Sequence, residues 1–133
     1  MLLSEAARHE KVTQGSISLA FVGEARMRTL NKFYRGKNKV TDVLSFGEPR
    51  KHTKSVPFAL PKGEEMYLGE IIICISHAAR QAKKHGWPLE YELNRLFLHG
   101  FLHILGYGHE KSEKEALHME GIEEEILAAY RES

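Results

Sequence analysis

Cysteine is the scarcest reactive residue in this sequence, because Cys74 is the only one among 133 residues. A disulfide within the chain is therefore excluded, and a lone thiol inside an apolar run usually packs as a small hydrophobic side chain. Such sparing use of cysteine is typical of a reducing compartment, so we expect a cytoplasmic protein.

Long hydrophobic runs are lacking as well. The two longest, at about 71–75 and 96–105, are too short or too often interrupted by histidine and glycine to cross a bilayer. Polar Ser4 and Glu5 follow the apolar start of the chain directly. The pattern therefore predicts neither a signal peptide nor a membrane partner.

Repeats, low-complexity tracts and interdomain linkers are also missing, which favours one domain over residues 1–133. The net charge of +1 hides an uneven distribution: residues 1–109 contain 16 lysines and arginines against 10 acidic residues, whereas residues 110–133 contain 3 against 8. One basic cluster consists of Arg26, Arg28, Lys32, Arg35, Lys37 and Lys39. Such a cluster fits a positive face for a polyanion, and it fits ordinary solvated surface charge equally well.

Hydrophobic periodicity predicts strands at 15–22, 42–46 and 67–75, and helices at 23–34, 76–85, 89–105 and 112–130. The segment 67–75 is apolar on both faces, so we expect it at the centre of the sheet. Ser76 is expected to cap the helix that follows it. The segment 47–63 is expected to be a mobile loop. The order β-α-β-β-α-α-α indicates an α+β domain with a small sheet covered by helices.

Three histidines near the end of the third predicted helix carry the chemistry of the sequence. His99 and His103 are four residues apart, so they project from one helix face and can reach the same tetrahedral ion. Gly106 can adopt a left-handed conformation and reverse the chain, which returns His109 towards that ion. The spacing is typical of a zincin site, in which three histidines bind one Zn²⁺ and leave one coordination position open.

A single histidine on an apolar helix face is more often a core residue than a ligand, and two at this spacing make the alternatives about even. Three, in a segment this apolar, favour ligation, because unsatisfied imidazole nitrogens are costly to bury. Three neutral ligands leave the full charge of the ion to acidify a bound water. The other histidines are interpreted as surface or structural residues: His9, His52, His77, His85 and His118.

Gly100 stands where a metalloprotease of the His-Glu-x-x-His type has its general base. Glycine can neither accept a proton nor polarise a zinc-bound water, so peptide hydrolysis by that mechanism is disfavoured.

Three blocks of the sequence, 31–46, 68–73 and 99–109, together resemble the YbeY family of bacterial rRNA maturation factors, which are proposed metal-dependent endoribonucleases. The similarity extends from about residue 16 to residue 127. The family usually has Asp directly before the third histidine, where this chain has Gly108, so the role of that carboxylate is absent or passes to Glu110. The segment before Gly15 is also shorter than in the family.

The resemblance implies a zincin-like fold, with a small mixed sheet packed against helices and the metal at the end of a cleft. It implies a single-strand-specific endoribonuclease that acts on rRNA, chiefly at the 3′ end of the small-subunit rRNA, and in ribosome quality control. The implied partners are rRNA and the ribosomal small subunit or its proteins, with no role for DNA. It also assigns function to Arg35, which matches an arginine regarded as important in the family and could bind two phosphate oxygens.

Other residues of the matching blocks are weaker candidates. Lys37 and Lys39 could extend a groove that follows phosphates, and Tyr34 or Phe46 could stack on an unpaired base. Two further side chains, Asp42 and Ser45, are as well explained by turn and strand structure as by substrate contact. Glu70 is a candidate partner for a ligand histidine, and a buried salt bridge explains it equally well.

Several alternatives stay open at this point. The attacking group is either a metal-activated water or the 2′-hydroxyl of the RNA, and three imidazoles also accept nickel, copper or cobalt. The enzyme hypothesis competes with a ribosome-associated RNA-binding factor that zinc stabilises and that has no intrinsic catalysis.

Overall fold

The computed structural model describes Leu2, Ala6, Arg8, Glu10 and residues 15–47, 67–107 and 112–132. Within these residues the elements follow the predicted order: β1 (Ser16–Val22), α2 (Glu24–Arg35), β2 (Val43–Gly47), β3 (Tyr67–Cys74), α3 (Ile75–His85), α4 (Leu89–Ile104) and α5 (Glu113–Glu132). The α+β class is thus confirmed. The segment predicted to be a mobile loop lies, from residue 48 onward, outside the described residues.

The described strands form one mixed sheet in the order β1-β3-β2, with β1 parallel and β2 antiparallel to β3. The prediction that β3 is central is therefore confirmed. The reason is that β3 buries side chains on both faces: Ile71 and Ile73 face one way, and Ile72 and Cys74 the other.

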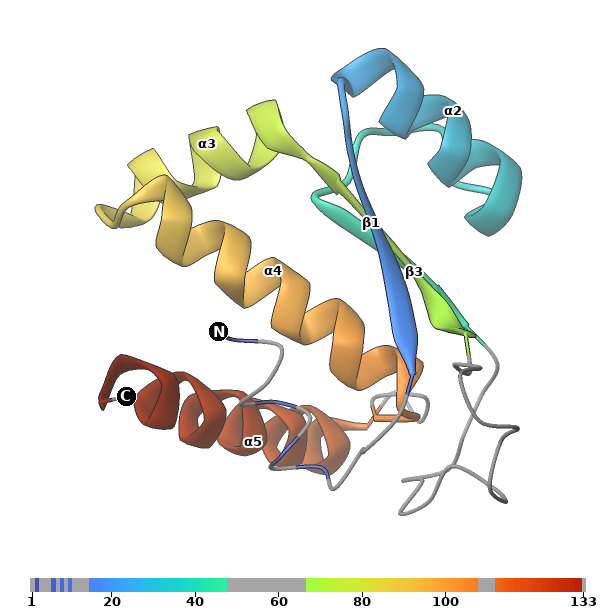
Figure 1. Cartoon of the computed structure of the whole chain (residues 1–133). Coiled ribbons are helices and arrows are strands. Elements are labelled where there is room, and N and C mark those ends of the chain that lie inside the picture. Colours follow the sequence, from blue (N-terminus) through green and yellow to red (C-terminus); the bar gives the residue numbers. More distant parts are fainter. Residues whose placement is uncertain are drawn as a thin grey trace.

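Helix α2 covers one face of the sheet (Figure 1). Its Met27 is fully buried in a small core with Leu44, Ile72 and Cys74. The helix ends at Gly36, which has the left-handed φ of 71° and donates its N–H to the Lys32 carbonyl. A glycine is suited to that position because it has no Cβ to strain the left-handed turn.

Helix α4 covers the opposite face and lies between the sheet and α5 (Figure 1). The larger core forms there, around Phe101, Leu98 and Leu102 of the helix and Ile71 and Ile73 of β3. The predicted buried helix at 89–105 is therefore confirmed, and as α4 it contributes the central side chains of the larger core.

Gly100 is a point at which α4 packs closely against β3. A Cβ at this residue would lie 3.2 Å from side-chain carbons of Ile71, closer than side chains normally pack. The glycine seen in the sequence as a missing protease base is thus also a packing requirement.

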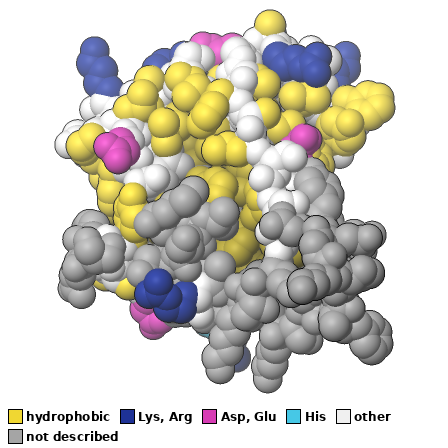
Figure 2. Space-filling view, viewed as in Figure 1, with side chains coloured by type: hydrophobic (Ala, Val, Ile, Leu, Met, Phe, Trp, Pro, Cys, Tyr) yellow, Lys and Arg dark blue, Asp and Glu magenta, His cyan; other side chains and the backbone are white. Residues whose placement is uncertain are grey.

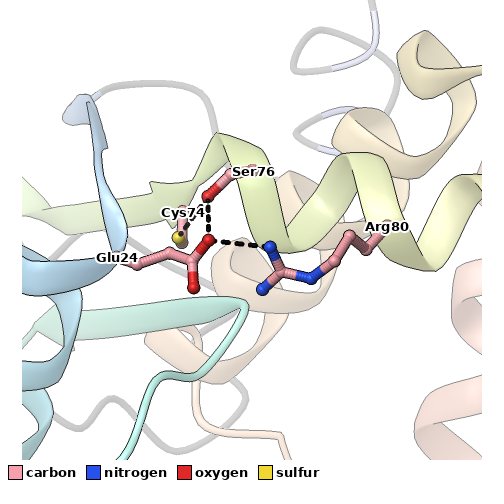
Figure 3. A network of polar contacts seen from close by, with 4 residues as sticks. All are labelled: Glu24, Cys74, Ser76 and Arg80. Atoms are coloured by element: carbon pink, nitrogen blue, oxygen red, sulfur yellow. Dashed lines mark hydrogen bonds and ion pairs between the residues drawn. The ribbon is translucent and has the colours of Figure 1, made fainter.

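Ser76 does not cap α3, contrary to the sequence prediction. The helix follows β3 without a loop, with Cys74 at the N-cap position and no side-chain cap. The Ser76 hydroxyl instead donates to Glu24 Oε2 at 3.1 Å, and Arg80 Nη1 donates to the same oxygen at 2.7 Å (Figure 3). This exposed network joins the start of α2 to the first turns of α3, and it holds the pKa of Glu24 below its usual value.

One face of the molecule is rich in exposed hydrophobic side chains. Leu19 and Phe21 of β1 are 45% and 52% exposed, and Figure 2 shows hydrophobic atoms gathered over the upper part of this face. Among the described residues, no helix is long and apolar enough to cross a bilayer.

Candidate metal centre and its cleft

A cleft of about 670 Å³ opens where α4 crosses the outer strand β2. The following polar or charged side chains line it: Arg35, Asp42, Ser45, Gln81, His85, Glu92, Arg95, His99, His103 and Glu123. They come from α2, α3, α4, α5 and the segment around β2, so only the folded chain brings them together.

His99 and His103 lie on one face of α4, as their spacing predicts. Their Nε2 atoms are 3.0 Å apart, and their ring planes are inclined by 76°. Two imidazoles that bind a tetrahedral ion at 2.0–2.1 Å have nitrogens about 3.3 Å apart. The two nitrogens are therefore already close to the separation that a shared zinc ion requires.

Glu123 of α5 orients the first of these rings. Its Oε1 lies 2.9 Å from His99 Nδ1, and its side chain is only 15% exposed. When His99 donates its Nδ1–H to this carboxylate, the neutral ring keeps a lone pair on Nε2, which is the nitrogen that faces His103. A carboxylate behind a histidine in this way is the usual support of a metal ligand.

Sequence reasoning missed Glu123 because its partner is 24 residues away on another helix. One signal was present: a carboxylate stood on the otherwise apolar stripe of 112–130, next to Ile122. Glu70, the residue considered for this role, does not support either of the two described histidines. It faces the α2 side of the sheet, where it lines a second cavity that no described histidine reaches.

His109, the third predicted ligand, lies outside the described residues together with Gly108 and Glu110. Among the described residues, no three histidine, cysteine or acidic side chains are grouped closely enough to hold a metal. The three-histidine site therefore stays a prediction, of which the structure describes two members.

The turn before His109 has the predicted form. Gly106 has a positive φ of 112° and donates its N–H to the His103 carbonyl at 3.0 Å. Tyr107 then donates its N–H to Leu102 and its hydroxyl to Glu10 Oε1, and burial raises the pKa of this phenol. These bonds fix the direction in which the chain leaves α4.

Arg35 lies at the end of α2 and lines the same cleft as His99 and His103. Its guanidinium is exposed, so it is accessible to a ligand in the cleft. The structure thus brings together the arginine and the two described histidines of the predicted site.

Arg95 is a second cleft arginine that sequence reasoning did not single out. Buried Glu92, which is 1% exposed, accepts hydrogen bonds from Arg95 Nη1 at 3.0 Å and from Trp87 Nε1 at 2.8 Å. The guanidinium also lies 5.1 Å from the centre of the Trp87 ring. The signal was the helical spacing of Glu92, Arg95 and His99, which places all three along one side of α4.

Of the remaining candidate residues, some line the metal cleft and others do not. His85, interpreted as a surface or structural residue, lines the cleft and stacks on Trp87, with ring centres 4.5 Å apart. Asp42 also lines it, but its Oδ1 accepts the N–H of the next residue, Val43, at 2.7 Å, which is a local contact at the start of β2. Lys37 and Lys39 are exposed and are not among the described residues that line the cleft.

The chain is similar to several known proteins. The family model described as "Endoribonuclease YbeY" matches residues 1–131. Curated proteins of that name from Halalkalibacterium halodurans, Persephonella marina and Staphylococcus saprophyticus are 43%, 37% and 39% identical to the chain. The alignments cover 97%, 92% and 97% of this chain and 82%, 75% and 82% of those proteins.

A solution structure of a Thermotoga maritima protein has a similar fold, with a TM-score of 0.59 at 23% identity. The match covers 98% of this chain and 82% of the other.

Proposed function

The chain belongs to the YbeY endoribonuclease family, and from this premise we propose that it is a zinc-dependent hydrolase that cleaves single-stranded regions of rRNA. Its proposed role is maturation of the small-subunit rRNA 3′ end and ribosome quality control in the cytoplasm. The family name supports an RNA substrate, and the ribosomal partners are part of the proposal.

The observation that carries the metal part of the proposal is the pair of imidazoles on α4. The Nε2 atoms of His99 and His103 face each other at 3.0 Å, and Glu123 supports His99 from behind. In the proposal these two residues and His109 hold one Zn²⁺. When bound, zinc would supply an acidified water and polarise a phosphoryl oxygen.

The arginines of the cleft are suited to the substrate. Cleavage of a phosphodiester builds negative charge on the phosphoryl oxygens, which fixed cations stabilise. Arg35 is exposed at the cleft wall and can bind two oxygens of one phosphate. Arg95 is held in place by buried Glu92, so it can contribute positive charge without a large loss of side-chain freedom.

Proton transfer requires a group other than residue 100. Gly100 packs against Ile71, so α4 has no room there for the glutamate of a metalloprotease. Both a water and the RNA 2′-hydroxyl remain compatible with the cleft as the attacking group, and either would need its proton accepted by water or by a neighbouring side chain.

The decisive experiment pairs metal analysis with cleavage of a defined precursor rRNA. We expect His103→Ala to abolish both zinc content and cleavage, whereas Arg35→Glu keeps zinc and impairs cleavage. His118→Ala and Arg28→Glu are matched controls, because both residues are exposed and neither lines the cleft.

Full cleavage by zinc-free His103→Ala protein would contradict the proposal. A nuclease-free wild-type protein that binds zinc and rRNA but never cuts would instead be the ribosome-associated factor.

A further inference from the structure

Two aromatic rings stand between the metal cleft and the second cavity. Tyr34 of α2 and Phe46 of β2 pack with their ring centres 4.8 Å apart and their planes inclined by 57°. We call this pair the aromatic ridge. Tyr34 is 57% exposed, so most of its ring is available to a ligand.

The second cavity, of about 720 Å³, lies on the α2 side of the sheet. Both residues of the aromatic ridge line this cavity as well as the metal cleft. The aromatic ridge therefore borders both cavities, and a chain-like ligand that crosses the two rings would reach from one cavity to the other.

Charge on the two sides of the ridge suits a polyanion. Arg35 lines the metal cleft, and Arg26, about two and a half turns earlier on α2, lines the second cavity. Both arginines are exposed. An arginine, an aromatic surface and another arginine in succession match the alternation of phosphates and bases in a single strand.

Glu70 is the acidic residue that lines the second cavity. A carboxylate repels phosphate, but it accepts hydrogen bonds from the exocyclic amino groups of bases. A cavity lined by both Glu70 and Arg26 therefore fits a nucleotide whose base and phosphate point in different directions.

We propose that the second cavity is a nucleotide subsite, in which the RNA strand bound at the metal cleft continues over the aromatic ridge. One base stacks on Tyr34, and Arg26 contacts a phosphate beyond it. This inference rests on the proposed function, since the ligand is the same RNA.

The ring is tested by steady-state cleavage of a long single-stranded RNA by the whole zinc-loaded protein. Stacking of one base changes affinity by roughly tenfold, so we expect Tyr34→Ala to raise KM about tenfold and Tyr34→Phe to restore it. Leu117→Ala is the control: Leu117 of α5 is 62% exposed and lines neither cavity. A fluorescent base analogue next to the cleavage site should be quenched by the wild type and not by Tyr34→Ala.

The cation is tested by the salt dependence of KM. Loss of one phosphate contact should lower the slope of log KM against log salt concentration by roughly 0.7 in Arg26→Ala. Arg28→Ala should keep the wild-type slope, because Arg28 is exposed on the same helix and lines neither cavity.

Wild-type KM in both Tyr34→Ala and Arg26→Ala, with cleavage intact, would overturn the subsite and leave the proposed function standing. Normal RNA kinetics with loss of binding to a ribosomal protein would assign the ridge to a protein partner and also overturn it. Absence of RNA cleavage and binding in the wild type would remove both proposals.

Discussion

The two faces of the sheet carry cavities of similar volume but of different chemistry. On the side of α4, the charged and hydrogen-bonding side chains contact one another. Glu123 contacts His99, His99 contacts His103, and Glu92 accepts a hydrogen bond from Arg95. On the side of α2, the exposed ring of Tyr34, half-buried Phe46 and Arg26 line a largely apolar cavity next to a small apolar core. The first arrangement suits an ion that needs fixed ligands, and the second suits a flexible strand that needs surface.

The difference follows from how tightly each helix packs. Helix α4 lies against β3 at Gly100 and is covered by α5, so its polar side chains are positioned from two sides. Helix α2 has only Met27 and Asn31 fully buried and Leu30 partly buried, and most of its other side chains are exposed. The polar side chains on the α4 side of the sheet are thus constrained by packing, whereas those on the α2 side are accessible to solvent.

The largest expected effect comes from Gly100→Glu, which disrupts the close packing of α4 against β3. The new carboxylate would be buried against Ile71 without a partner, so we expect the free energy of unfolding to fall by about 3 kcal/mol or more. Urea unfolding followed by circular dichroism measures it. Gly121→Ala is the control, because a Cβ there meets nothing within 4 Å, and it should gain up to about 1 kcal/mol. Unchanged stability in Gly100→Glu would show that α4 packs more loosely than described.

A smaller effect, on zinc affinity, is expected from substitution of Glu123. It tests whether this carboxylate holds the ligand His99 in place. Glu123→Ala should weaken zinc binding by roughly 10–100-fold, and Glu123→Gln by less, because an amide oxygen can still accept the His99 Nδ1–H. Competition with a chromogenic chelator measures the affinity without any assay of activity. The exposed neighbour Glu124→Gln should bind zinc as the wild type does. Equal affinities in all four proteins would exclude a supporting role for Glu123.

The smallest effect is expected at the polar network that joins α2 to α3. Glu24 has a pKa below its usual 4.5 because Arg80 and Ser76 donate hydrogen bonds to its charged form. A lowered pKa stabilises the fold above the unfolded-state value, and that contribution is lost as pH falls through the folded-state value. Glu24→Gln should therefore melt slightly below the wild type at neutral pH, and the two melting temperatures should converge as pH falls through the lowered pKa of Glu24. A difference in melting temperature that persists in acid would assign the effect to something other than this ionised carboxylate.

Most of the secondary structure could be predicted from sequence because it depends on periodicity. The apolar run of β3 and the helical repeat of α4 each specify their own burial, and the i, i+4 spacing of His99 and His103 specifies their common face. Ser76 was misassigned as a cap because a local signal was read without its partner: its hydroxyl binds Glu24, 52 residues away.

Glu70 and Glu123 show where such reasoning ends. Alternation along β3 shows that Glu70 and Ile71 face opposite ways, but it does not say which face α4 covers. Helix α4 packs on the Ile71 face of β3, so Glu70 lies on the α2 side of the sheet. The carboxylate that contacts His99 is therefore Glu123 of α5.

The sequence by itself determined the order of the elements, the paired histidines, the turn at Gly106 and the family resemblance, because each is encoded within a short stretch of chain. Only the tertiary structure decided that Arg35 and Arg95 share the metal cleft, that Glu123 stands behind His99, and that Tyr34 and Phe46 line both cavities. Those relations depend on which helix packs on which face of the sheet. That choice is made by the combined burial of the whole core and is not encoded in any single segment.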